Sequence, residues 1–259
     1  MNAFDEVAFG GDPGRWPLPT ATTPAEHWLR AVAAGGQGRY GSALADLVAL
    51  VRRNPEGPLA SLALSTRASF LRQLGGHEEA RAWDGRASAC AGLDAGAAAD
   101  ALIGLGADAL GVSRFALSDR LLQRAADLVC ATTAPRLPIR LAWVRAELAM
   151  FTGDGPAAVA YAERAVELAD GWTSVRHVVK SQVVTAAALC SAGRIEGARR
   201  VADAALTVAE QTGLIPLSWA LTCLLADIGS AAHSPEQIGA ARDRFADTVR
   251  QRGGSWTAR

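Results

Sequence analysis

Lysine is almost absent from this chain, because Lys180 is its single copy and every other basic side chain is an arginine. The scarcity excludes a Gly-x-x-x-x-Gly-Lys phosphate loop, since His177, Val178 and Val179 precede Lys180 where that motif needs glycine. A Schiff base formed by lysine would have to use the same residue. Chemistry that depends on lysine is therefore limited to one position.

An excess of one charge is also missing, because 26 basic side chains balance 26 acidic ones. A neutral chain lacks the field that attracts phosphates, so we expect no specific nucleic acid and no membrane among its partners. The longest uncharged apolar run, 211–226, is shorter than the roughly 18–20 residues of a membrane span. The N-terminus is acidic where a secretion signal would be basic, which predicts a cytoplasmic protein.

Cysteine and histidine are few and widely spaced. The four cysteines show no Cys-x-x-Cys spacing, and no histidine has a second ligand four residues away, so we expect no metal and no cofactor. We expect the cysteines to be small buried thiols in a reducing compartment. A Gly-x-Ser-x-Gly motif is missing as well, and no catalytic constellation is visible, so the chain is not expected to be an enzyme.

Strand patterns and hairpin turns are missing too, whereas helical spacing of apolar residues is found along most of the chain. The 56 alanines favour helix strongly. One clear example is the stripe formed by Ile195, Ala198, Ala202, Ala205, Leu206 and Ala209. We therefore predict an all-α protein with at least about two-thirds of its residues in helices.

Glycines and prolines divide the helices into pairs. The glycines expected between the two helices of a pair are Gly35-Gly36, Gly75-Gly76, Gly111, Gly153 and Gly193. The pattern predicts six helical hairpins at about 25–53, 59–91, 97–131, 138–169, 174–211 and 215–252. Residues 1–24 are expected to form an irregular N-terminal arm, with Phe4, Phe9 and Trp16 available to anchor it, and residues 253–259 to form a frayed tail.

The hairpins are copies of one unit. A shift of 40 residues places Ala146, Gly153, Ala158 and Ala165 on Ala186, Gly193, Ala198 and Ala205. Smaller shifts extend the series backwards to Ala68, Ala80, Ala87, Ala31, Ala43 and Leu50. Small residues that recur about every 37–40 positions predict an α-solenoid, because neighbouring helices approach closely at these sites.

The first unit, with Gly38-Arg39-Tyr40, Ala43, Leu47 and Pro55, resembles the tetratricopeptide repeat (TPR). The repeats are longer than the usual 34 residues of that family, Trp28 lies one place off the expected tryptophan, and most units lack the closing proline. The longer period is similar to TPR-like arrays in the sensor domains of some large bacterial transcription activators. The resemblance covers about 25–211 and implies a right-handed superhelix whose first helices line a concave groove, with 215–252 as a degenerate cap.

The groove positions implied by this resemblance contain several polar and charged side chains. They are Ser65, Ser69 and Arg72 in the second unit, Arg140, Trp143 and Glu147 in the fourth, and Arg176 and Lys180 in the fifth. Arg140 and Lys180 are equivalent under the 40-residue shift. Cations around Trp143 suit a peptide with an acidic group and an apolar side chain. In the alternative interpretation the cations are solubilising residues and Trp143, like Trp219, is hairpin core.

These patterns lead to one principal functional hypothesis and two alternatives. The principal hypothesis is a non-catalytic adaptor that binds another protein or peptide in its groove. The first alternative is a ligand- or peptide-sensing regulatory domain linked to transcription control. The second is an enzyme whose site forms only on oligomerisation, although no residues in the sequence point to one.

Overall fold

The computed structural model describes residues 3–257, of which 76% are helical and none lies in a strand. The helices are α1 (Ala3–Phe9), α2 (Pro24–Gly36), α3 (Tyr40–Arg53), α4 (Pro58–Gln73), α5 (His77–Cys90), α6 (Ala95–Gly111), α7 (Phe115–Val129), α8 (Arg136–Phe151), α9 (Gly155–Asp170), α10 (Val175–Ser191), α11 (Ile195–Gln211), α12 (Ile215–Ile228) and α13 (Pro235–Gln251). The predictions of an all-α chain and of about six hairpins are confirmed.

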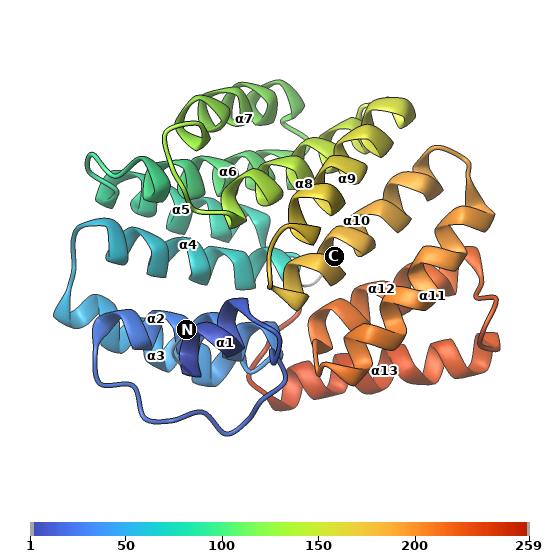
Figure 1. Ribbon diagram of the computed structural model, residues 1–259, viewed down its shortest axis with the longest axis horizontal. Coiled ribbons are helices and arrows are strands. Elements are labelled where there is room, and N and C mark those ends of the chain that lie inside the picture. Colours follow the sequence, from blue (N-terminus) through green and yellow to red (C-terminus); the bar gives the residue numbers. More distant parts are fainter. Residues whose placement is uncertain (1–2, 258–259) are drawn as a thin grey trace.

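The hairpins are arranged in two layers (Figure 1). The first helices, α2, α4, α6, α8, α10 and α12, pack on one another in sequence order and form the inner layer. Each second helix packs on its own first helix and, except for α13, on the first helix of the next hairpin. Packing between sequence neighbours is the arrangement of a helical-repeat solenoid.

The small repeat positions lie where these helices touch. Ala146, Ala158 and Ala165 of the fourth hairpin are fully buried, and so are their equivalents Ala186, Ala198 and Ala205 in the fifth. In the third hairpin the position is Gly106, where an added Cβ would lie 2.9 Å from a side-chain carbon of Leu122. The repeat therefore marks close helix contacts, as the periodicity predicts.

The turns inside two hairpins correct the sequence prediction. Gly38 and Ser113 have the left-handed backbone conformation, with φ of 71° and 60°, at positions expected for Gly36 and Gly111. Gly35, Gly36 and Gly111 lie inside helices instead. Gly35 and Gly111 permit close packing there, because an added Cβ would lie 2.2 Å from the Phe70 ring and from the His77 ring respectively.

The first and last hairpins meet, so that the array closes on itself. The backbone N–H of Gly41 donates to the carbonyl of Arg252 at 2.9 Å, and the Arg252 guanidinium donates to the carbonyl of Gln37 at 2.7 Å. Val249 of α13 shares a buried cluster with Tyr40 of α3. Figure 1 shows α2 and α3 beside α12 and α13 at the bottom of a ring of hairpins.

The N-terminal arm contains a helix, so the expectation of an irregular segment is wrong for residues 3–9. Phe4, Val7 and Ala8 are spaced to form one apolar helical face, and they are buried against Leu29 and other residues of α2. The sequence prediction missed this helix because it is short and is followed by a segment rich in glycine and proline. Trp16 is partly exposed beneath the guanidinium of Arg39, whose central carbon lies 4.3 Å from the ring centroid.

The described part of the C-terminal tail, 253–257, packs against the ring, which corrects the expectation of fraying. The Thr257 N–H donates to the carbonyl of Leu74 at 2.9 Å. The rings of Trp256 and Trp219 lie 4.2 Å apart. An indole that finds an aromatic partner and buried surface fixes the segment that precedes it. Residues 258 and 259 of the predicted tail lie outside the described residues.

The cysteines are not the buried thiols that we expected. Cys90, Cys190 and Cys223 are half-buried, and Cys130 is exposed. Free Cys is often buried, but burial is decided by the position in the repeat, and these residues lie off its close-contact positions.

Among residues 3–257, no helix has both the length and the apolarity to cross a bilayer.

Candidate functional site

A cavity of about 320 Å³ lies at the centre of the ring. Every inner helix contributes to its wall, together with α1 and the C-terminal segment. The chain is only 6% aromatic, yet nearly half of its Phe, Trp and Tyr residues line this central cavity. They are Phe9, Trp28, Tyr40, Phe70, Trp143, Trp219 and Trp256. The cavity therefore has an apolar, aromatic wall supplied by distant parts of the sequence.

Two of the tryptophans are fixed by equivalent hydrogen bonds. The indole N–H of Trp28 donates to the Thr66 hydroxyl at 3.0 Å, and that of Trp143 donates to the Ser181 hydroxyl at 2.9 Å. In both cases the acceptor lies 38 residues further on, on the next inner helix. Trp143 thus joins two hairpins and also lines the central cavity.

His177 is buried at the wall of the central cavity among aromatic rings. Its ring centroid lies 5.3 Å from that of Trp143 and 4.6 Å from that of Trp172. Its Nδ1 lies 2.8 Å from the Ser174 hydroxyl, beside the first turn of α10. Burial, reinforced by nearby arginines, lowers the pKa of His177 well below its usual value of 6.5. The imidazole is therefore neutral and adds to the aromatic wall.

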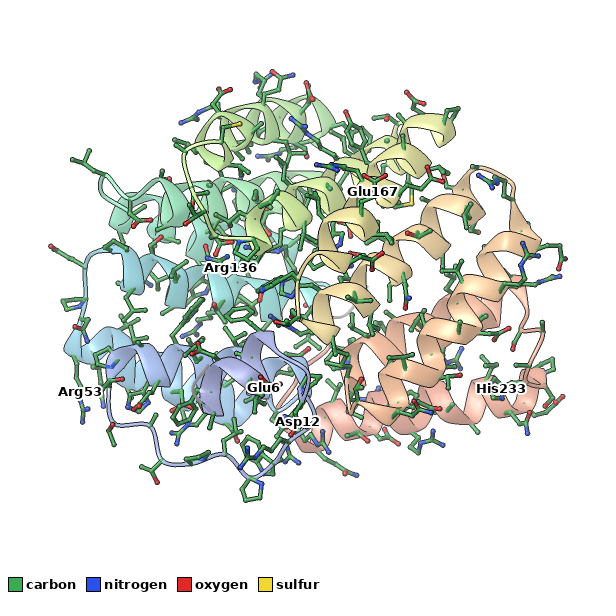
Figure 2. The ribbon with its side chains drawn as sticks, in the orientation of Figure 1. Glu6, Asp12, Arg53, Arg136, Glu167 and His233 are labelled. Atoms are coloured by element: carbon green, nitrogen blue, oxygen red, sulfur yellow. The ribbon has the colours of Figure 1, made fainter. Side chains whose placement is uncertain are left out.

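Three arginines, Arg136, Arg140 and Arg176, lie on the same side of the central cavity, and we call them the arginine triad. Arg136 donates from Nη1 to the Asp100 carboxylate at 2.7 Å, and Arg140 contacts the other oxygen of the same carboxylate. Arg176 has no carboxylate partner among the described residues, and its buried Nε makes no hydrogen bond there. Figure 2 places Arg136 toward the middle of the ring, while Arg53 and His233 lie at its outer edges.

The charges of the arginine triad are costly to hold in this position. Burial lowers the pKa of Arg136, Arg140 and Arg176 to about 10 in each case. The neighbouring charge of Arg136 lowers the pKa of Arg176 further, and Arg176 has the same effect on Arg140. All three remain charged at neutral pH. The site is therefore positively charged and poor in balancing carboxylates.

Lys180 and Glu147 form an ion pair at 3.3 Å, with both side chains about one-third exposed. The Lys180 ammonium lies 5.9 Å from the centroid of the Trp143 indole. Lys180 lines the central cavity, whereas Glu147 does not. This pair is balanced internally and adds no net charge to the site.

The second hairpin contributes less than the sequence suggested. Ser65 lines the central cavity but donates its hydroxyl to Asp84 at 2.6 Å, and Ser69 donates to the carbonyl of Thr66 at 2.7 Å. Arg72, which the sequence placed in the groove, lies outside the lining of the central cavity. Its Nη1 pairs with Asp84 and, at 2.9 Å, with Asp108, because these buried carboxylates on α5 and α6 require a cation.

The structure thus brings together six of the eight predicted groove residues and leaves Glu147 and Arg72 out of the lining. Sequence reasoning missed Arg136, Asp100 and His177, as well as the aromatic residues from the two ends of the chain. One signal was present: the 40-residue shift that relates Arg140 to Lys180 also relates Arg136 to Arg176. No sequence pattern indicated that Phe9 and Trp256 would reach the same cavity.

Within residues 3–257, no three side chains of the metal-binding types are grouped to hold an ion. The chain matches no protein-family model, and a search of the curated proteins finds no significant relative.

Proposed function

We propose that this protein is a non-catalytic module that binds a small organic molecule in its central cavity and uses the binding for regulation. The observation that carries the proposal is the shared wall: all six inner helices, α1 and the C-terminal segment line one cavity of about 320 Å³. This volume is at the lower end of those found for small-molecule sites, which are mostly apolar with a few convergent polar groups.

A ligand in this position would contact every hairpin at once. Binding would then favour the closed arrangement of the ring over any arrangement in which the first and last hairpins separate. The seam between these hairpins is small and includes the hydrogen bonds of Arg252 with Gln37 and Gly41. A closed state that is stabilised by ligand is the property that a sensor requires.

The closed ring favours the sensing alternative over the binding of an extended protein partner. A long peptide would need a groove that is open at both ends. Here the ends are joined, because Val249 of α13 packs with Tyr40 of α3 and the Gly41 N–H donates to the carbonyl of Arg252. Phe9 and Trp256 also occupy the lining. The TPR-like classification and the link to bacterial transcription control come from the resemblance alone and remain part of the proposal.

Two further features support a non-catalytic role and a cytoplasmic location, which we include in the proposal. The Ser174 hydroxyl that contacts His177 is buried and does not line the central cavity, so this pair offers no nucleophile to a bound molecule. Cys90, Cys130 and Cys190 are free thiols, although Cys130 is exposed, which suits a reducing compartment.

Filling the cavity tests the proposal. Ala220 on α12 lines the cavity, so Ala220→Phe places a ring inside it, while Ala160→Phe on the exposed face of α9 is the matched control. We expect compounds from a diverse library to raise the Tm of the wild type and of the control Ala160→Phe. The same compounds should not raise the Tm of Ala220→Phe. If no compound stabilises the wild type, or if Ala220→Phe responds equally, the proposal is wrong.

A further inference from the structure

The balance of charge around the central cavity is uneven. The arginine triad contributes three guanidinium groups, and Asp100 is the only carboxylate among the lining residues. Asp100 is already bound to Arg136 and Arg140. The buried Arg176 Nε has no hydrogen-bond acceptor in the described part of the chain. A buried donor on a charged group is normally satisfied, so this one indicates a missing acceptor.

The remaining acidic groups close to the site are not free to supply that acceptor. Asp84 and Asp108 are paired with Arg72, and Glu147 is paired with Lys180. His177 is held neutral, as described above, and its Nδ1 faces Ser174. Each of these carboxylates therefore already has a cationic partner, and none of them is paired with Arg176.

We propose that the ligand of the central cavity is an organic oxyanion, a carboxylate or a phosphate monoester, whose charged group binds Arg176 and Arg136 and whose flat apolar body lies against the aromatic wall. This inference rests on the proposed function and specifies its ligand. Guanidinium groups bind both kinds of oxyanion through paired N–H donors, and Arg suits a site that is partly shielded from water.

The residues around Arg136 and Arg176 indicate which kind of organic group carries the oxyanion. The central guanidinium carbon of Arg176 lies 5.7 Å from the Phe9 ring centroid, and that of Arg136 lies 5.6 Å from the Trp28 centroid. An anion bound between them is therefore next to aromatic surface. The indoles of Trp28 and Trp143 are oriented by hydrogen bonds and present fixed planes. Planar apolar groups pack well against such planes.

Matched probes on one scaffold test the ligand class. We would measure the binding of 2-naphthoate, 2-naphthyl phosphate and the neutral 2-naphthamide to the full chain by isothermal titration calorimetry. We expect at least one anion to bind about tenfold or more tightly than the amide, which corresponds to about 1.4 kcal/mol. The carboxylate and phosphate arms show which oxyanion the site prefers.

Variants then locate the anion. Arg176→Gln keeps a hydrogen-bond donor but removes the charge, and we expect it to abolish the tenfold preference for the anion over the amide. Arg164→Gln is the control, because Arg164 is exposed on α9 and pairs only with Glu167. A Tm close to that of the wild type shows that Arg176→Gln is folded.

The outcomes separate this inference from the function on which it rests. If the amide binds as tightly as both anions, or if Arg176→Gln keeps the preference, the oxyanion inference is wrong while the cavity remains a ligand site. If none of the three probes binds and no library compound distinguishes wild type from Ala220→Phe, both proposals fail.

Discussion

Two clusters of largely buried arginines lie on neighbouring walls of the ring and differ in how their charge is balanced. On the α4–α6 wall, Arg72 lies between the carboxylates of Asp84 and Asp108, and Ser65 donates to Asp84. On the α8–α10 wall, Arg136 and Arg140 share Asp100, and Arg176 has no carboxylate partner among the described residues. Arg72 does not line the central cavity, whereas all three arginines of the triad do.

The difference separates a structural charge network from a binding site. The pKa of Arg72 is raised because attraction by Asp84 and Asp108 outweighs the cost of burial. The pKa of Arg176 is lowered to about 10 because burial has no such compensation. A cation whose partners come from the protein stabilises the fold, while a buried cation without partners costs stability and is expected where a ligand completes the site.

The largest effect on stability is expected from breaking the balanced cluster, which consists of Arg72, Asp84 and Asp108. Arg72→Met leaves Asp84 and Asp108, whose side chains are fully buried, without their cation. Removal of one partner from a buried ion pair costs about 3–5 kcal/mol of unfolding free energy. Urea denaturation measures this loss. A loss below about 1 kcal/mol would show that Arg72 is not needed to neutralise the two carboxylates.

A smaller effect, equal on both walls, is expected from overpacking the repeat contacts. Ala87 on α5 and Ala165 on α9 are equivalent positions, and both are fully buried. Replacement of either by leucine should cost about 1–3 kcal/mol, because the added methyl groups have no space. Urea midpoints of Ala87→Leu and Ala165→Leu should agree, with Ala160→Leu as the exposed control. Unequal losses would mean that the two walls differ in packing as well as in charge.

The balanced cluster should also show itself in the pH dependence of stability. Burial raises the pKa of Asp108 to about 7 from its ordinary value of 3.8. The folded protein then binds this proton more tightly than the unfolded chain, so the contribution of Asp108 to unfolding free energy falls as pH rises from about 4 to about 7. Asp108→Asn should remove that decline. Parallel stability–pH curves for wild type and variant would contradict the assignment.

The smallest effect is expected at the unpaired cation. Arg176→Met removes a charge that has no carboxylate partner, so stability should change by less than about 1 kcal/mol or increase. Differential scanning calorimetry without added ligand provides the measurement. A loss as large as that of Arg72→Met would place the two arginines in the same structural class and remove the contrast between the walls.

Much of the fold could be predicted because the hairpin is a local unit. The stripe at Ala198, Ala202 and Ala205 specifies a helix and the face that it buries, and the 40-residue period specifies what packs on it. The turn residues were less predictable. Gly35 and Gly111 were expected in turns, but the structure uses their small size for contact with Phe70 and His77, which lie on other helices.

The candidate site was predictable only in part. Arg140, Trp143, Arg176 and Lys180 were identified because the repeat relates successive inner helices. Arg72 was placed in the same set, although its position near the end of α4 turns it toward Asp84 and Asp108. Periodicity shows that a residue is on the inner helix, but the direction of a long side chain depends on the charges that neighbouring helices place within its reach.

By itself, the sequence determined the helices, their pairing and the close contacts between them, since each of these depends on residues within one repeat or the next. The tertiary structure decided that the array closes. That closure depends on Arg252 reaching Gln37, 215 residues away, and on Trp256 meeting Trp219. Small differences in packing accumulate from one hairpin to the next, so their sum, unlike each local contact, is not encoded at any single position. Closure turns a row of inner helices into a central cavity and brings its arginines and aromatic rings together.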